Sequence, residues 1–142
     1  MRMVQQLTAA VARLFQLKQQ EKYDQALQEV EKAYGDLLGL NAQIISMFDA
    51  ATLAPLLGHA EKMKTLATLF FEQAELHRLK HEPEHAQKFY QRALEMLLEA
   101  YRSRGEEDAE CREKIQVLLE YVNVHDLRPG SADILRQNRL LE

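Results

Sequence analysis

The chain has 142 residues, of which 46% are hydrophobic and 28% charged, and this length fits one domain with its own core, since domains cluster near ~100–150 residues. Its single cysteine excludes an internal disulfide framework and a Cys-x-x-Cys site, and its 5 Gly and 3 Pro are too few for the turns of an all-β protein. A net charge of −4 argues against a nucleic-acid-binding surface, and no apolar run approaches the ~18 residues of a membrane span. The first residues, MRMVQQLTAAVARLFQ, lack the unbroken apolar stretch of a signal peptide, so we expect a cytoplasmic protein without nucleic-acid or membrane partners.

Residues 1–38 predict an antiparallel helical hairpin. Apolar residues between positions 4 and 17 recur every three or four residues, which is the spacing of one buried helix face. The polar stretch 18–22 ends this helix, and a second apolar stripe runs over residues 23–38. Gly39 follows directly and suits the left-handed residue after a helix end.

Residues 39–59 predict an insert of two short helices. Asn41 can cap the first helix, and either Asp49 or Thr52 can cap the second. Pro55 fits the first turn of that second helix, and Gly58 ends it.

Residues 60–104 predict a second, longer hairpin. Its first helix, from about residue 60 to 80, carries apolar residues on more than one face, so we expect it to be the most buried helix. Pro83 starts the next helix and Gly105 ends it.

Residues 105–142 predict one or two closing helices. The acidic run 106–108 opens a helix that extends to Val122, because negative charge favours the positive end of the helix dipole. Ser131 can cap a short last helix. The apolar residues of that last helix are Ile134, Leu135, Leu140 and Leu141.

The two predicted hairpins match each other at an offset of 60 residues. Small residues two helical turns apart let one helix approach another closely, and a bulky residue between them fills the groove. The matched positions are Ala26 with Ala86, Val30 with Tyr90, Ala33 with Ala93, and Leu37-Leu38 with Leu97-Leu98.

The segments YDQALQEVEKAY and PEHAQKFYQRAL resemble the second helices of tetratricopeptide repeats. Residues 1–122 also resemble a group of small bacterial tetratricopeptide-like proteins, through LFQLKQQEKYDQALQEVEKAYGDLLGL, the short-helix insert and LATLFFEQAEL. The resemblance implies an all-α fold of antiparallel hairpins of the α-α superhelix type, and it assigns no activity. The repeat positions are filled by Tyr23, Ala26, Val30 and Ala33, and again by Pro83, Ala86, Tyr90 and Ala93.

The chain departs from this family's pattern at several positions. Glu21 and His81 stand where the repeat has a glycine before its second helix, and Leu38 and Leu98 stand where it has a closing proline. The period of 60 exceeds the ~34 residues of a standard array, and two units are fewer than the ~3 that usually make a stable solenoid. We therefore expect one compact domain rather than an open superhelix.

The resemblance also implies a peptide-binding groove lined by the first helix of each hairpin. Phe70 and Phe71 point ~100° apart on a helix, so either that helix lies between two layers or one phenylalanine lines the groove. The alternative is that the insert covers this face and Phe71 belongs to the core. By position, the protein-binding residues are Thr8, Ala12, Phe15, Lys18 and Gln19 in the first unit and Thr68, Phe71, Glu72, Glu75, Arg78 and Leu79 in the second.

Neither a metal site nor a catalytic site is expected. His77, His81 and His85 have the spacing that can share a metal on one helix, but Pro83 interrupts the helix between them. The acidic residues around Cys111 oppose thiolate formation. The sequence has no nucleophile-elbow, P-loop or dinucleotide-binding motif, so it predicts neither an enzyme nor a cofactor.

The sequence thus predicts a non-catalytic protein-protein interaction module, an adaptor or scaffold for another protein or peptide. The alternative is a structural homo-oligomer, in which the last helix has too little of its own chain to pack on and buries against a second copy. A third and less favoured hypothesis is a helical bundle that binds a metal or a small molecule.

Overall fold

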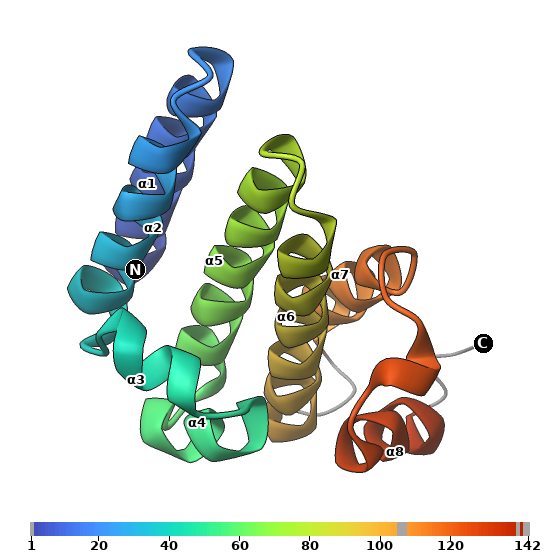
Figure 1. The fold of residues 1–142 in the computed structure, drawn as a ribbon. Helices are drawn as coiled ribbons and strands as arrows, with labels where there is room; N and C mark the ends of the chain where they lie inside the picture. Colours follow the sequence, from blue (N-terminus) through green and yellow to red (C-terminus); the bar gives the residue numbers. More distant parts are fainter. Residues whose placement is uncertain (1, 105–107, 139, 141–142) are drawn as a thin grey trace.

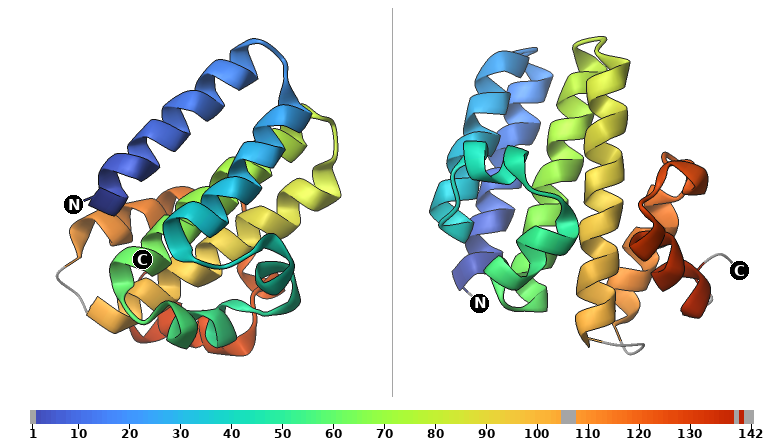
Figure 2. Two further views of the ribbon diagram at one scale, coloured as in Figure 1. Left: turned by 90° about the vertical axis from the view of Figure 1, so that its left-hand side faces the viewer. Right: turned by 60° about the horizontal axis from the view of Figure 1, so that its bottom comes forward.

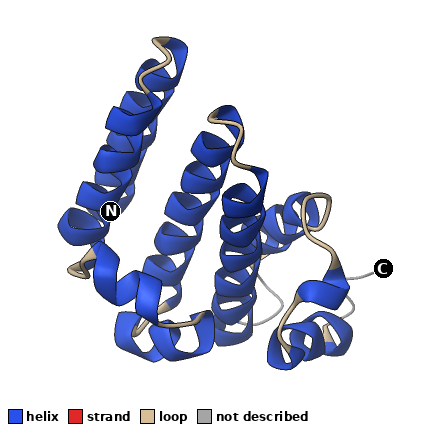
Figure 3. Cartoon of the chain, viewed as in Figure 1, coloured by secondary structure: helices blue, strands red, loops and turns tan. Residues whose placement is uncertain are grey.

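In a computed structural model of the protein, residues 2–104, 108–138 and 140 are described, and they form helices joined by turns, with no strand among them (Figures 1 and 3). The predicted all-α fold class is confirmed. None of the helices in these ranges is both long enough and apolar enough to cross a membrane. The helices are α1 (Arg2–Gln19), α2 (Tyr23–Leu38), α3 (Ala42–Met47), α4 (Ala50–Leu57), α5 (Ala60–Leu79), α6 (Pro83–Arg104), α7 (Ala109–Leu118), the 3-10 turn η1 (Val124–Asp126) and α8 (Pro129–Gln137).

The long helices form two antiparallel pairs, α1 with α2 and α5 with α6 (Figure 1). The right-hand view of Figure 2 shows them following one another across the molecule, from the α1–α2 pair through α5 and α6 to α7 and α8. Helix α2 packs against α5, whereas α7 and α8 pack against α6. The α5–α6 pair is therefore the centre of the fold.

The turns of the two hairpins have the same backbone geometry. In each turn one residue adopts a left-handed conformation, Glu21 with φ 58° and His81 with φ 60°. The amide of the following residue then donates a hydrogen bond to a carbonyl of the preceding helix, which satisfies a group that the helix end leaves free. These bonds are Lys22 to Leu17 and Glu82 to His77, each at 2.9 Å.

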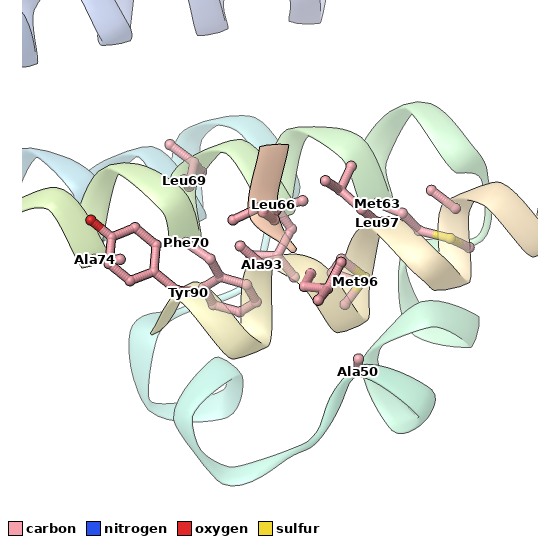
Figure 4. Close-up of a cluster of buried hydrophobic side chains, with 14 of the residues drawn as sticks. Ala50, Met63, Leu66, Leu69, Phe70, Ala74, Tyr90, Ala93, Met96 and Leu97 are labelled. Atoms are coloured by element: carbon pink, nitrogen blue, oxygen red, sulfur yellow. The ribbon is translucent and has the colours of Figure 1, made fainter. Parts of the chain in front are cut away.

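The core lies between α5 and α6 (Figure 4). Leu66, Leu69 and Phe70 of α5 pack there with Ala93 and Met96 of α6, and all five are fully buried. Helix α5 buries residues on more than one face, as expected. The longest continuous buried stretch is nevertheless residues 93–101 of α6, because α4, α5, α7 and α8 all pack around that helix.

The caps of the insert follow the sequence signals. The Asn41 side chain accepts a hydrogen bond from the Ile44 amide at 2.8 Å, and Asp49 accepts one from the Thr52 amide at 2.9 Å. Asp49 is thus the cap of α4, which begins at residue 50. Pro55 consequently lies in the second turn of this helix, and its placement in the first turn was wrong.

Arg92 of α6 fixes the insert to the core. Its Nη2 donates hydrogen bonds to the carbonyl oxygens of Ile45 and Phe48, both at 2.6 Å, and its guanidinium lies 4.5 Å from the centre of the Phe70 ring. A cation is well placed here, because the carbonyl end of a helix is its negative end. Burial lowers the pKa of Arg92 from its usual value, although the side chain keeps its charge.

The C-terminal helices differ from the prediction at two boundaries. Asp108 caps α7 by accepting a hydrogen bond from the Cys111 amide at 3.0 Å, but the helix ends at Leu118 rather than at Val122. Helix α8 begins at Pro129, whose fixed φ suits a first helical position, so Ser131 is a buried residue of the first turn and not the cap. The predicted helix end at Gly105 and the predicted acidic residues Glu106 and Glu107 lie outside the described residues.

The last helix finds its packing partners within its own chain. Ile134, Leu135 and Leu140 are all buried, and Gln116 of α7 donates a hydrogen bond to the Leu140 carbonyl at 2.6 Å. The expectation that this helix lacks a surface to pack on is therefore wrong for these residues, and Leu141 lies outside the described residues.

Candidate functional site

None of the eleven residues predicted to line a groove is buried. The first-unit residues Thr8, Ala12, Phe15 and Gln19 are exposed on α1, and the remaining seven are exposed or half-buried. In the left-hand view of Figure 2, α1 and α7 both lie toward the left side of the molecule. The insert packs against α2, α5 and α6.

One predicted pair joins the two hairpins directly. Lys18 Nζ of α1 lies 2.7 Å from Glu72 Oε2 of α5, and both side chains are largely shielded from solvent. This ion pair fixes the end of α1 against the middle of α5. The pair also neutralises the charges of Lys18 and Glu72, two residues predicted to line the groove.

An apolar pocket of about 220 Å³ opens beside Phe71. Helix α5 forms one wall and α7 the opposite wall, and no insert residue is among the described residues that line it. Val117 of α7 is 47% exposed, so an apolar side chain stands at the edge of the pocket. The pocket is lined by Ala67, Thr68, Phe71, Leu97, Lys114, Val117 and Leu118.

Three aromatic rings meet at the side of this pocket. Phe71 makes edge contacts with Tyr90 and Tyr121, with ring centres 5.8 Å and 6.1 Å apart, and the two tyrosine rings stack at 4.6 Å. The Gln87 side chain donates a hydrogen bond to the Tyr121 carbonyl at 3.0 Å, which holds the turn after α7 against α6. Phe71 is thus half-buried against two tyrosine rings, rather than a fully buried core residue.

Charged groups at this surface are paired with one another. Tyr90 donates a hydrogen bond to the Glu75 carboxylate, and Arg78 Nε lies 3.1 Å from Glu75 Oε2. Burial raises the pKa of Glu75, but the hydrogen bonds from Arg78 and Tyr90 outweigh burial and hold it below its usual value. Lys114 pairs with Glu110 on its own helix at 3.1 Å. The surface therefore offers an apolar centre with a rim of neutralised charges.

The structure does not bring Phe15 into the pocket. Its side chain is 59% exposed on α1, and it is not one of the residues that line the pocket. The Thr8 hydroxyl donates to the Val4 carbonyl of the same helix at 2.9 Å. Of the predicted residues, only Thr68 and Phe71 line the pocket, and Phe15 is a separate apolar position on the neighbouring helix.

Sequence reasoning missed the wall that α7 contributes. Ile115 and Leu118 of that helix are buried, whereas Val117 lies outside the buried face. A valine outside the buried face of a short helix was the one available signal for an apolar exposed surface. Nothing in the local sequence placed Val117 beside Phe71, because that contact depends on how α7 docks.

The histidines form a stacked group. The His77 ring lies against the rings of His85 and Phe89, with centres 5.2 Å and 5.4 Å apart, and His77 Nδ1 lies 2.8 Å from Glu82 Oε1. His81 occupies the left-handed turn position. Across the described ranges, no group of three or more histidine, cysteine or acidic side chains could hold a metal ion.

Cys111 is a buried structural residue. Its thiol donates to the Leu97 carbonyl at 3.3 Å, and burial raises the pKa of the thiol to about 12, with the nearby Asp108 carboxylate adding to the shift. A thiol that stays protonated at neutral pH is a poor nucleophile.

No protein-family model, curated protein or solved structure matches this chain.

Proposed function

We propose that the chain is a non-catalytic protein-protein interaction module, an adaptor or scaffold that binds a peptide or helix of another protein. The observation that carries this proposal is the apolar pocket between α5, α6 and α7, with Val117 exposed at its edge and Phe71 in its wall. Binding surfaces for peptides commonly combine an apolar pocket, aromatic anchors and a polar rim. The residues of this surface are Thr68, Phe71, Lys114, Val117 and Tyr121, with Phe15 on the adjacent helix.

A tetratricopeptide-like arrangement is the finer part of the proposal. Two features support it: the matching turns at Glu21 and His81, and the burial of the alanines at the matched positions of α2 and α6. In such an arrangement α1 and α5 are the first helices of successive units, and α7 continues the same face. The pocket then lies on the face that binds peptides in the resembled repeats.

The size of the pocket suits one apolar side chain of a partner. A volume of about 220 Å³ holds several waters, since each occupies ~30 Å³ in the liquid. Replacing these waters with a leucine- or phenylalanine-sized group contributes ~1.5–3 kcal/mol of apolar burial. One such anchor, offset by the entropy lost on association, gives a weak and reversible interaction.

Selection from a random peptide library displayed on phage would test this function. Peptides retained by the immobilised protein should carry a shared apolar position and should bind it in solution, as followed by fluorescence anisotropy. Val117→Asp should abolish that binding, because it places a charge at the edge of the apolar pocket. Leu56→Asp is the matched control, since Leu56 is 59% exposed on α4 and no described residue of the insert lines the pocket.

Peptides that bind Val117→Asp as tightly as the unmodified protein would contradict the proposal, and so would a library that yields no binder. Both variants should keep the helical circular dichroism of the parent chain, because both positions are exposed.

A homo-oligomer is the second candidate. The observation that favours it is the exposed apolar surface of the insert, since the last helix is buried within its own chain. Met47 and Leu56 are large apolar residues that α3 and α4 leave exposed. Exposed apolar side chains of this kind can mark a contact surface. Mass measured by light scattering would distinguish the candidates, because only the homo-oligomer requires a mass that falls on substitution of Met47 and Leu56 by aspartate.

A further inference from the structure

A second pocket, of about 420 Å³, lies where α4, the start of α5 and the end of α6 meet. It shares no lining residue with the pocket beside Phe71. Ala54, Pro55 and Met63 give it apolar walls, and Glu99 and Arg102 give it one charge of each sign. Its volume corresponds to several times the ~30 Å³ that one water occupies, so it can hold a small organic group.

Glu99 is a buried carboxylate that nevertheless lines this pocket. Its side chain is 7% exposed, and its Oε1 accepts a hydrogen bond from Arg102 Nη2 at 2.6 Å. Within the described ranges this is the one hydrogen bond that Glu99 makes, and every fully buried polar side-chain atom there has a partner. Oε2 is therefore not fully buried, and its residue lines the pocket. A carboxylate can accept about four hydrogen bonds, so most of its capacity remains open to a ligand.

Arg102 does not close the site. Its side chain is 66% exposed and reaches Glu99 from the next turn of the same helix. An ion pair whose cation is solvated to this extent stabilises by only ~0.2–1 kcal/mol. A second cation that reaches Oε2 through the pocket can therefore share the carboxylate or displace the arginine at small cost.

We propose that this pocket binds a primary ammonium or guanidinium group carried on a short aliphatic chain. Glu99 is the counter-ion, because it is the one carboxylate among the described residues that line the pocket, and a charge-assisted hydrogen bond is the strongest kind it can make. Ala54, Pro55 and Met63 contact the aliphatic chain. The same chemistry occurs in a free alkylamine and in a lysine side chain, and the two sources differ only in what is attached to the chain.

A titration with n-pentylammonium, followed by ¹H–¹⁵N NMR of the full chain, tests the proposal. Amide shifts should gather around Gly58 and Ser103, which line the pocket, and n-pentanol at the same concentration should leave them in place. A second arm with N-acetyl-lysine-N-methylamide distinguishes the sources: tighter binding than pentylammonium indicates a lysine side chain, and weaker binding indicates a free amine.

Two variants should change the dissociation constant in opposite directions. Glu99→Gln should weaken pentylammonium binding about tenfold or more, since it removes a charge-assisted bond. Arg102→Gln should tighten binding about two- to fivefold, because it removes the competing cation. Arg102 is exposed, so this second variant folds even if loss of the buried carboxylate were to destabilise the first.

Equal shifts with pentanol and pentylammonium would overturn the proposal. So would an unchanged dissociation constant in Glu99→Gln, or weaker binding in Arg102→Gln, since the latter is what a site for anions would show.

Discussion

Glu21 and His81 adopt the same left-handed backbone conformation at equivalent points of the two hairpin turns. The left-handed region costs an L-residue ~1–2 kcal/mol, and glycine is the usual residue after a helix end for that reason. Each turn therefore contains a non-glycine residue in a backbone conformation that is unfavourable for it. The hydrogen bonds that follow each residue, at Lys22 and Glu82, keep the turns in this form.

Replacing either residue with glycine should stabilise the protein. We expect Glu21→Gly and His81→Gly each to raise the free energy of unfolding by ~0.5–1 kcal/mol, because the relief of strain exceeds the added entropy of the unfolded chain. Urea unfolding followed by circular dichroism measures the change. Gln20→Gly is the control, since Gln20 has no positive φ, and it should lower stability. A loss of stability in both turn variants would show that these side chains contribute more than their backbone costs.

Phe70 and Phe71 should differ sharply in what their truncation costs. Phe70 is fully buried under the Arg92 guanidinium, so Phe70→Ala should lower the free energy of unfolding by ~3–5 kcal/mol. Phe71 is half-buried against two tyrosines, so Phe71→Ala should cost ~1–2 kcal/mol. The same urea experiment compares them. Equal losses would mean that Phe71 is a core residue and does not line a binding surface.

Removing the Arg92 guanidinium should release the insert. We expect Arg92→Met to cost ~2–3 kcal/mol, because two carbonyl groups lose a charged donor while the aliphatic volume is kept. Hydrogen exchange should show the amides of α3 exchanging faster, with those of α1 unchanged. Arg136→Met, which removes only a pair exposed to solvent with Asp133, should change stability by less than ~0.5 kcal/mol.

The Cys111 thiol should be almost inert in the folded protein. Because burial raises its pKa to about 12, the thiolate fraction at pH 8 falls by a factor on the order of 10³ below that of an unfolded cysteine with a pKa of ~8.5. Alkylation by iodoacetamide should be slow in buffer and fast in urea. Its native rate should rise with pH up to the raised pKa. A native rate within tenfold of the unfolded rate would show that the thiol is open to solvent.

Overpacking should reveal the close helix crossings. Ala26 and Ala86 are buried at matched positions of α2 and α6, and a leucine at either should cost ~1–3 kcal/mol. Melting temperatures from circular dichroism provide the measure, with Ala12→Leu on the exposed face of α1 as the control. If both core variants melted with the parent protein, the helices would not be in close contact there.

The sequence predicted the long helices and most of their ends, because their signals are local. A stripe of apolar residues defines each buried face, and Asn41, Asp49 and Gly39 act through their own backbone neighbours. The predicted boundaries of the C-terminal helices were wrong because local signals do not always single out one position. Ser131 and Pro129 are both residues that commonly start a helix, and α8 begins at Pro129.

The candidate surface could be predicted only in part. Phe71 was singled out because it follows Phe70 on a helix, and Phe15 by its position in the repeats that the chain resembles. The pairing of Lys18 with Glu72 and the docking of α7 beside α5 join residues far apart in the chain. No local pattern encodes those distances, so the second wall of the pocket emerged only from the fold.

Arg92 binds the main chain of the insert, through the carbonyl groups of Ile45 and Phe48. Hydrogen bonds to main-chain carbonyl oxygens do not depend on the identity of the side chains around them. Exposed residues of the insert, such as Met47, therefore contribute little to holding the insert in place. These exposed positions of the insert can accordingly take new side chains, by mutation or by design, provided that its buried residues, such as Ile45 and Leu53, stay in the core.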